Sequence, residues 1–72
     1  MTQDILTKHI ELNSFLKVLG IANTGGMAKL TIRSGEVKVN REVETRNKRK
    51  LHAGDTVEFD GKIYIVDEKL LR

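Results

Sequence analysis

Residues 24–40 read Thr-Gly-Gly-Met-Ala-Lys-Leu-Thr-Ile-Arg-Ser-Gly-Glu-Val-Lys-Val-Asn and contain the start of a helix, its end and a strand. Thr24 can accept hydrogen bonds from backbone N–H groups that the first turn of a helix leaves unpaired. Gly35 can take the left-handed conformation that ends a helix. Two valines then alternate with Lys38, which is typical of a strand with one buried face. The stretch predicts a helix from about Gly25 to Ser34 that turns sharply into a strand.

A second helix is predicted directly upstream. Its apolar residues recur at the i, i+3, i+4 and i+7 positions of an amphipathic helix, and they are Leu12, Phe15, Leu16 and Leu19. Gly20 can end this helix, and residues 21–23 leave room for a short connector only. We therefore expect two helices packed as a compact pair. In the later helix, Ala28 and Ile32 share one side, while Lys29 and Arg33 share another that can face solvent or a ligand.

The rest of the chain reads as short strands and turns. Residues 3–10 predict a short edge strand, and residues 36–45 predict a hairpin that turns at Asn40-Arg41. Residues 46–50 hold four cations and no apolar anchor, which predicts an exposed loop. After Leu51 and a Gly54-Asp55 turn, a second hairpin is expected over residues 56–66, with Asp60-Gly61 as its turn.

These elements predict the α+β class, with two short packed helices followed by a small, mainly antiparallel sheet. We expect residues 1–72 to form a single domain, because a chain of 72 residues supports only one small core. The last residues, 67–72, are expected to fray or to cover the sheet.

Composition excludes several classes of protein. The chain has no cysteine and only two histidines, His9 and His52, so that neither a disulfide framework nor a structural zinc site is expected. The sequence has no apolar run of the roughly 18 residues that a membrane span requires. Its first residues lack the basic start and apolar core of a signal peptide. We expect a cytoplasmic protein without metal or cofactor.

Positive charge is concentrated in the middle of the chain. Residues 23–50 carry eight lysines and arginines against three glutamates, whereas residues 51–72 carry three cations against five acids. A basic segment of this kind suits a polyanionic partner, although a merely solvated surface has about even odds for one basic run taken alone.

The start of the later helix is a candidate anion site. Gly25 and Gly26 leave the backbone bare there, and the unpaired N–H groups and positive end of a helix favour a phosphate. A loose helix start without a ligand is an equal alternative. A nucleotide-binding P-loop is excluded, because the required Gly-Lys-Ser/Thr ending is absent. The candidate binding residues are Thr24, Gly25, Gly26, Lys29, Arg33, Lys38, Arg41, Arg46, Lys48, Arg49 and Lys50.

Three classes of function can be weighed. An enzyme would need a nucleophile with a base, paired carboxylates in a pocket or a metal cluster, and the sequence offers none of these, so no catalytic residue is predicted. A DNA-reading helix is disfavoured, because Lys29 and Arg33 are accompanied by no Asn or Gln for base edges. Non-catalytic binding of structured RNA through phosphate contacts is favoured, with a protein-interaction adaptor or a non-specific DNA-binding module as the alternative.

The order of helix, helix, hairpin, basic loop and Gly-Asp turn resembles the S4 RNA-binding domain, also called the alpha-L motif. The resemblance covers roughly residues 11–59. It rests on Leu12, Phe15, Leu16, Gly20, Ala28, Ile32, Gly35, Val37, Val39, Asn40, Leu51, Gly54 and Asp55. Residues 25–29 further resemble small free-standing bacterial members that consist of little beyond this domain. The resemblance implies binding to ribosomal RNA or transfer RNA, with a ribosomal subunit as a partner, in ribosome assembly or another step of translation.

The sequence departs from the family at two positions. Many members have a Ser-Arg pair near the start of the second helix, with the arginine touching RNA, where this chain has Gly25-Gly26. Many also have Asn-Gly in the hairpin turn, where this chain has Asn40-Arg41. We hypothesise that Lys29, Arg46 and residues 48–50 supply the missing positive charge. We expect a monomer, because the sequence leaves no apolar stripe over for a partner.

Overall fold

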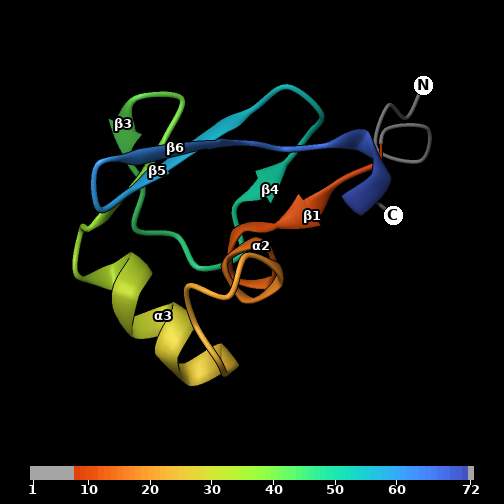
Figure 1. The fold of residues 1–72 in the computed structure, drawn as a ribbon. Coiled ribbons are helices and arrows are strands. Elements are labelled where there is room, and N and C mark those ends of the chain that lie inside the picture. The colour runs from red at the N-terminus through yellow and green to blue at the C-terminus, as the bar shows by residue number, and fades with distance from the viewer. Residues whose placement is uncertain (1–7, 72) are drawn as a thin grey trace.

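The computed structural model describes residues 8–71, in which two helices pack beneath a four-stranded antiparallel sheet (Figure 1). A second, two-stranded sheet lies above α2 in this view. None of the helices in residues 8–71 has the length and apolar character needed to cross a membrane. The elements in chain order are β1 (Ile10–Glu11), α2 (Leu12–Val18), α3 (Gly25–Arg33), β2 (Val37–Val39), β3 (Glu42–Val43), β4 (Lys50–Leu51), β5 (Thr56–Phe59), β6 (Lys62–Ile65) and the 3-10 turn η1 (Glu68–Leu70).

Both predicted helices are confirmed, and their ends follow from local chemistry. The hydroxyl of Thr24 accepts a hydrogen bond from the Met27 backbone N–H at 3.1 Å, which caps the start of α3. Gly35 follows the end of α3 with a φ of 85°, in the left-handed region that favours glycine. The buried side chains of α2 are Leu12, Phe15 and Leu16, and those of α3 are Ala28 and Ile32, as the sequence periodicity predicts. Leu19, also expected on the apolar side of the first helix, follows the end of α2 and packs partly buried against the core.

The larger sheet has the strand order β3-β2-β5-β6, and its neighbouring strands are antiparallel. Both hairpins have two-residue turns, at Asn40-Arg41 and at Asp60-Gly61. All four turn residues have positive φ, from 51° to 77°, which matches the twist of the flanking strands. The two hairpin turns are therefore as predicted, and Arg41 occupies its position with a φ of 74°.

The core lies between the helix pair and the inner face of this sheet. Val37, Val39 and Val57 point inward from the two central strands and are almost fully buried. Lys38 and Glu58, which are opposite each other in the register, are on the outer face. The buried apolar residues are Leu12, Phe15, Leu16, Ala22, Ala28, Ile32, Val37, Val39, Leu51, Val57 and Val66.

The ends of the strands differ from the sequence expectations. Of the predicted edge strand at residues 3–10, residues 3–7 lie outside the described part, and the observed strand β1 begins at Ile10. The return strand of the first hairpin ends at Val43, although the Glu44 N–H still donates to the carbonyl of Val37 at 2.9 Å. Lys50, expected in the exposed loop, belongs to β4 and pairs with Glu11 of β1. Such two-residue strands carry no periodicity that a sequence pattern could reveal.

Candidate nucleic-acid interface

The segment 46–50, called here the basic loop, is attached by its backbone to the start of α2. The Leu12 N–H donates to the carbonyl of Arg49 at 2.8 Å, and the Asn13 N–H donates to the carbonyl of Asn47 at 3.0 Å. The first N–H groups of a helix have no partner within the helix itself. The basic loop supplies partners for two of them, and its path is fixed as a result. Arg46, Lys48 and Lys50 are exposed, as expected from the sequence, but the backbone of the loop is anchored.

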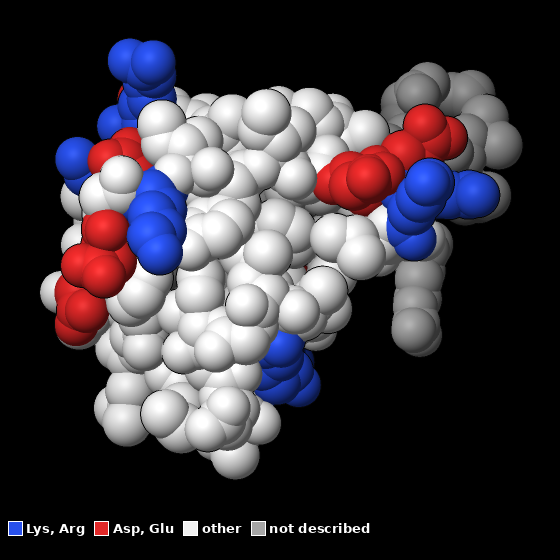
Figure 2. All heavy atoms as spheres, in the orientation of Figure 1, with Lys and Arg blue, Asp and Glu red and all other residues white. Residues whose placement is uncertain are grey.

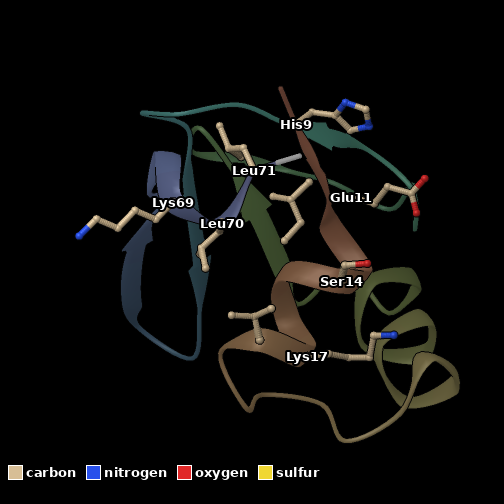
Figure 3. Close-up of a pocket in the computed structure, with 9 residues that line it drawn as sticks. His9, Glu11, Ser14, Lys17, Lys69, Leu70 and Leu71 are labelled. Atoms are coloured by element: carbon tan, nitrogen blue, oxygen red, sulfur yellow. The ribbon is translucent and has the colours of Figure 1, made fainter. Parts of the chain in front are cut away.

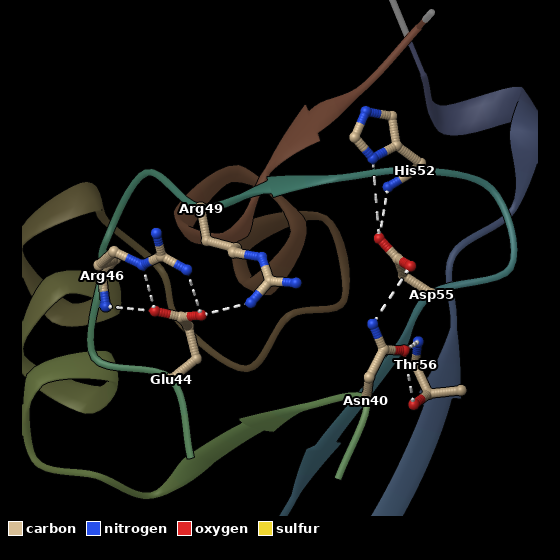
Figure 4. Close-up of polar contacts among 7 residues, drawn as sticks. All are labelled: Asn40, Glu44, Arg46, Arg49, His52, Asp55 and Thr56. Atoms are coloured by element: carbon tan, nitrogen blue, oxygen red, sulfur yellow. Dashed lines mark hydrogen bonds and ion pairs between the residues drawn. The ribbon is translucent and has the colours of Figure 1, made fainter. Parts of the chain in front are cut away.

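The loop is held a second time by the carboxylate of Glu44. One oxygen accepts from the Arg46 Nε at 2.8 Å and from the Arg46 backbone N–H at 3.0 Å. The other oxygen accepts from Arg46 Nη2 at 3.2 Å and from Arg49 Nη1 at 2.6 Å. Figure 4 shows both guanidinium groups converging on this one carboxylate. Glu44 is only 6% exposed, whereas the Arg46 side chain is 71% exposed, so that the acid is the covered member of the group.

The hydrogen bonds between Glu44 and the two arginines favour the charged forms of these residues. Hydrogen bonding from the Arg46 side chain is the main cause that lowers the pKa of Glu44 to about 2. Burial opposes this shift, and the hydrogen bonds from the Arg49 side chain and the Arg46 backbone N–H lower the pKa further. The same contact raises the pKa of Arg46 above its ordinary value. Glu44 is therefore fully ionised at neutral pH, and it neutralises one of the positive charges around it.

The four cations of the basic loop line a common open hollow of about 590 Å³. Its lining consists of Arg46, Lys48, Arg49 and Lys50. Even with Glu44 counted against them, a net positive charge of three remains at this place. A shallow depression lined by lysine and arginine suits phosphate groups, which accept charge-assisted hydrogen bonds.

The candidate residues of α3 form a separate, exposed group. Thr24 uses its hydroxyl for the cap, while the N–H groups of Gly25 and Gly26 have no hydrogen-bond partner within residues 8–71. Lys29 and Arg33 are exposed on a different side of α3 from the buried Ala28 and Ile32, as expected.

The remaining two candidates, Lys38 and Arg41, belong to the first hairpin. Lys38 faces outward opposite Glu58, and Arg41 is exposed in the turn. Within residues 8–71 neither side chain makes a hydrogen bond or ion pair with the basic loop. Of the candidates, the structure thus brings together the four cations of the basic loop, on one hollow.

Sequence reasoning missed Glu44, which is the residue that organises this hollow. The sequence predicts Glu44 only as part of the return strand of the first hairpin. An acid two residues before the first of four closely spaced cations is the signal that could have found it, because a carboxylate there has two arginines within reach.

A larger hollow of about 710 Å³ opens between α2 and η1 and has a different character (Figure 3). Apolar side chains of Ile10, Val18, Leu70 and Leu71 lie beside two lysines, a glutamate, a serine and His9. This mixed lining lacks the concentration of positive charge found at the basic loop. No group of three metal-binding side chains occurs within residues 8–71, and we identify no site for a metal or cofactor.

One face of the molecule has little charge. Figure 2 shows that lysine, arginine, aspartate and glutamate gather at the margins of this face and leave its centre free. Strand β6 runs across it (Figure 1), with the side chains of Ile63 and Ile65 exposed by 57% and 68%. The expectation from the sequence that no apolar stripe is left over was therefore wrong for β6, whereas the expected monomer stays a prediction.

Two helices beneath an antiparallel sheet, with a cationic loop at the start of the first helix, define a small α+β domain of the alpha-L type. A family model described as the S4 domain matches residues 4–67, and the chain belongs to this family. The S4 domain is a non-catalytic binding domain, which confirms the expectation that the chain is not an enzyme.

The similar proteins include one from Escherichia coli and one from Bacillus subtilis. The chain is 47% identical over 53 residues to the "Putative RNA-binding protein YbcJ" of Escherichia coli, an alignment that covers 74% of this chain and 76% of that protein. It is 46% identical over 55 residues to the "Probable ribosome maturation protein RlbA" of Bacillus subtilis, covering 76% and 78% of the two chains. The solution structure of YbcJ, described as having an alpha-L motif involved in RNA binding, superposes with a TM-score of 0.62 at 44% identity, over 82% of this chain and 75% of YbcJ. The family and the fold class expected from the sequence are both confirmed.

Proposed function

We propose that this protein binds structured RNA through phosphate contacts, with the hollow of the basic loop as the principal site. The observation that carries the proposal is that Arg46, Lys48, Arg49 and Lys50 line one hollow. Their cations can contact neighbouring phosphates of a folded RNA backbone at the same time. The bare N–H groups of Gly25 and Gly26, together with Lys29 and Arg33, offer a second set of contacts on α3.

Ribosomal RNA is the favoured ligand, with transfer RNA as the alternative. The name of the B. subtilis relative supports ribosomal RNA, because it refers to ribosome maturation. The role assigned here is non-catalytic and belongs to ribosome assembly in the bacterial cytoplasm. Residues 1–72 act as one domain and as a monomer. Aromatic side chains are too few for a base-stacking surface, so that recognition relies on the shape and charge of the RNA.

Equilibrium binding to a fragment of ribosomal RNA across a salt series tests this function, with duplex DNA of equal length alongside. Affinity that falls by roughly 0.7 to 0.9 log units per phosphate contact for each tenfold rise in salt is expected. RNA should bind more tightly than DNA, and the combined Lys48→Glu and Arg49→Glu variant should lose most of the binding. Equal affinity for DNA, or an unchanged affinity of this variant, would contradict the proposal.

A protein-interaction adaptor is the second candidate, and the exposed apolar side chains of β6 favour it. Ile63 and Ile65 lie on an edge strand whose outer side has no neighbouring strand within residues 8–71. An adaptor of this kind binds neither RNA nor DNA in the salt series, which separates it from the first candidate.

A further inference from the structure

We infer that Glu44 is a positioning residue of the RNA site, which holds the guanidinium groups of Arg46 and Arg49 in one arrangement ready for phosphate. This inference rests on the proposed function and assigns a role to a residue that carries the wrong charge for RNA. Its carboxylate makes four hydrogen bonds, three to Arg46 and one to Arg49, at 2.6–3.2 Å (Figure 4).

Among residues 8–71, the outer edges of both guanidinium groups have no hydrogen-bond partner. Arg46 uses Nε and Nη2 on Glu44, so that its Nη1 group is available to a ligand. Arg49 uses Nη1 and keeps its Nε and Nη2 groups. Both side chains line the hollow of the basic loop, with exposed fractions of 71% and 31%. A phosphate in the hollow can therefore bind these free donors while Glu44 keeps its own hydrogen bonds.

Fixing the arginines lowers the entropy cost of binding. A free arginine side chain loses considerable rotamer freedom when it is immobilised on a ligand. Here folding has already restricted that freedom, because Glu44 is buried and the loop backbone is bound to the start of α2. The buried carboxylate thus makes the cationic hollow rigid, although it removes one unit of positive charge.

Positioning and simple charge compensation predict opposite signs for Glu44→Gln. If Glu44 only offsets positive charge, its neutralisation removes an electrostatic repulsion and RNA binds more tightly. If Glu44 positions the arginines, RNA binds more weakly, by about fivefold or more, even though the net charge rises. Glu42→Gln is the matched control, because Glu42 is exposed two residues earlier and its neutralisation changes the net charge equally. The control should bind with unchanged or slightly tighter affinity.

The experiment measures binding of a ribosomal RNA fragment to the wild type and both variants across a salt series, with far-ultraviolet circular dichroism to verify folding. For Glu44→Gln we also expect a shallower salt dependence, by about 0.7 log units for each phosphate that the variant no longer binds. If Glu44→Gln weakened binding only through a structural change away from the phosphate contacts, the slope of log affinity against log salt would stay the same as in the wild type. In an Arg46→Ala background, Glu44→Gln should have a smaller effect than in the wild type, because its action passes through Arg46.

Arg46→Lys provides an independent test if Glu44→Gln fails to fold. This variant keeps the charge but cannot make the two-pronged interaction with Glu44, and it should also weaken binding with a shallower slope. Tighter binding by Glu44→Gln to the same extent as by Glu42→Gln would overturn the positioning role and leave RNA binding intact. Absence of RNA binding by the wild type would overturn both.

Discussion

The side chain of Asn40, at the end of β2, accepts a hydrogen bond from the Thr56 backbone N–H, 16 residues later, at 3.0 Å. The Asn40 N–H donates in turn to the carbonyl of Thr56 at 2.9 Å, and its side-chain amide donates to Asp55 at 3.3 Å. Asp55 also accepts from the His52 N–H at 2.8 Å (Figure 4). The Asn40 and Gly54-Asp55 parts of the family motif thus meet in space. They fasten the first hairpin to the strand that follows the basic loop.

Replacement of Asn40 by alanine should destabilise the protein by about 1–3 kcal/mol, because it removes the side-chain hydrogen bonds and strains a residue with positive φ. Asn40→Gly tolerates the φ of 51° and removes only the side-chain hydrogen bonds, so that it should destabilise the protein less. Urea unfolding measures both, and Asn23→Ala in the exposed connector is the control. An Asn40→Ala protein as stable as this control would show that these hydrogen bonds are unimportant.

Arg41 is expected to destabilise the turn of the first hairpin. Its φ of 74° is costly for a side chain with a Cβ atom, and glycine is preferred at this place in a two-residue turn. Arg41→Gly should raise the free energy of unfolding by about 0.5–1 kcal/mol, after allowance for the greater freedom of glycine in the unfolded chain. Thermal unfolding checks this. A lower melting temperature would contradict it.

The sequence predicted the local features of the fold and missed the interactions that assemble the site. Helix α3 and the hairpin turns depend on residues close together in the chain, such as Thr24 and Gly35, and these were recognised. The pairing of Lys50 with Glu11 joins segments far apart in the sequence, through strands too short to show alternation. Glu44 is buried beside the basic loop, whose backbone is hydrogen-bonded to the distant start of α2, so that its burial also depends on contacts between segments far apart in the sequence.

Glu44 also predicts how stability depends on pH. Its pKa is lowered from 4.5 to about 2 in the folded protein, so that its contribution is complete above the unfolded value and is lost as pH falls through 4.5 towards 2. The wild type should exceed Glu44→Gln in unfolding free energy by on the order of 2 kcal/mol near neutral pH. This difference should shrink when urea unfolding is repeated at about pH 3. A difference that stays constant between the two conditions would mean that the carboxylate has an ordinary pKa.

Thr24→Ala should lower stability by about 1 kcal/mol, because the Met27 N–H loses the side-chain acceptor that caps α3. Thr24→Ser retains a hydroxyl and should be nearly as stable as the wild type. The two variants differ in the capping hydroxyl and share the same neighbouring glycines. The difference between their free energies of unfolding therefore measures the contribution of the hydroxyl. Equal stability of the two would show that the hydroxyl does not stabilise the helix.

Single charge removals can locate the RNA on the surface. Lys48 lines the hollow of the basic loop, whereas Lys62 starts β6 and is not part of its lining. Both are exposed lysines, and replacing either with glutamine lowers the net charge by one. If a phosphate occupies the hollow, Lys48→Gln should reduce the slope of log affinity against log salt by about 0.7 to 0.9, while Lys62→Gln should leave it nearly unchanged. Equal reductions in both variants would indicate that the RNA responds to overall charge and that no particular contact forms at the basic loop. A reduction confined to Lys62→Gln would instead place the RNA near β6.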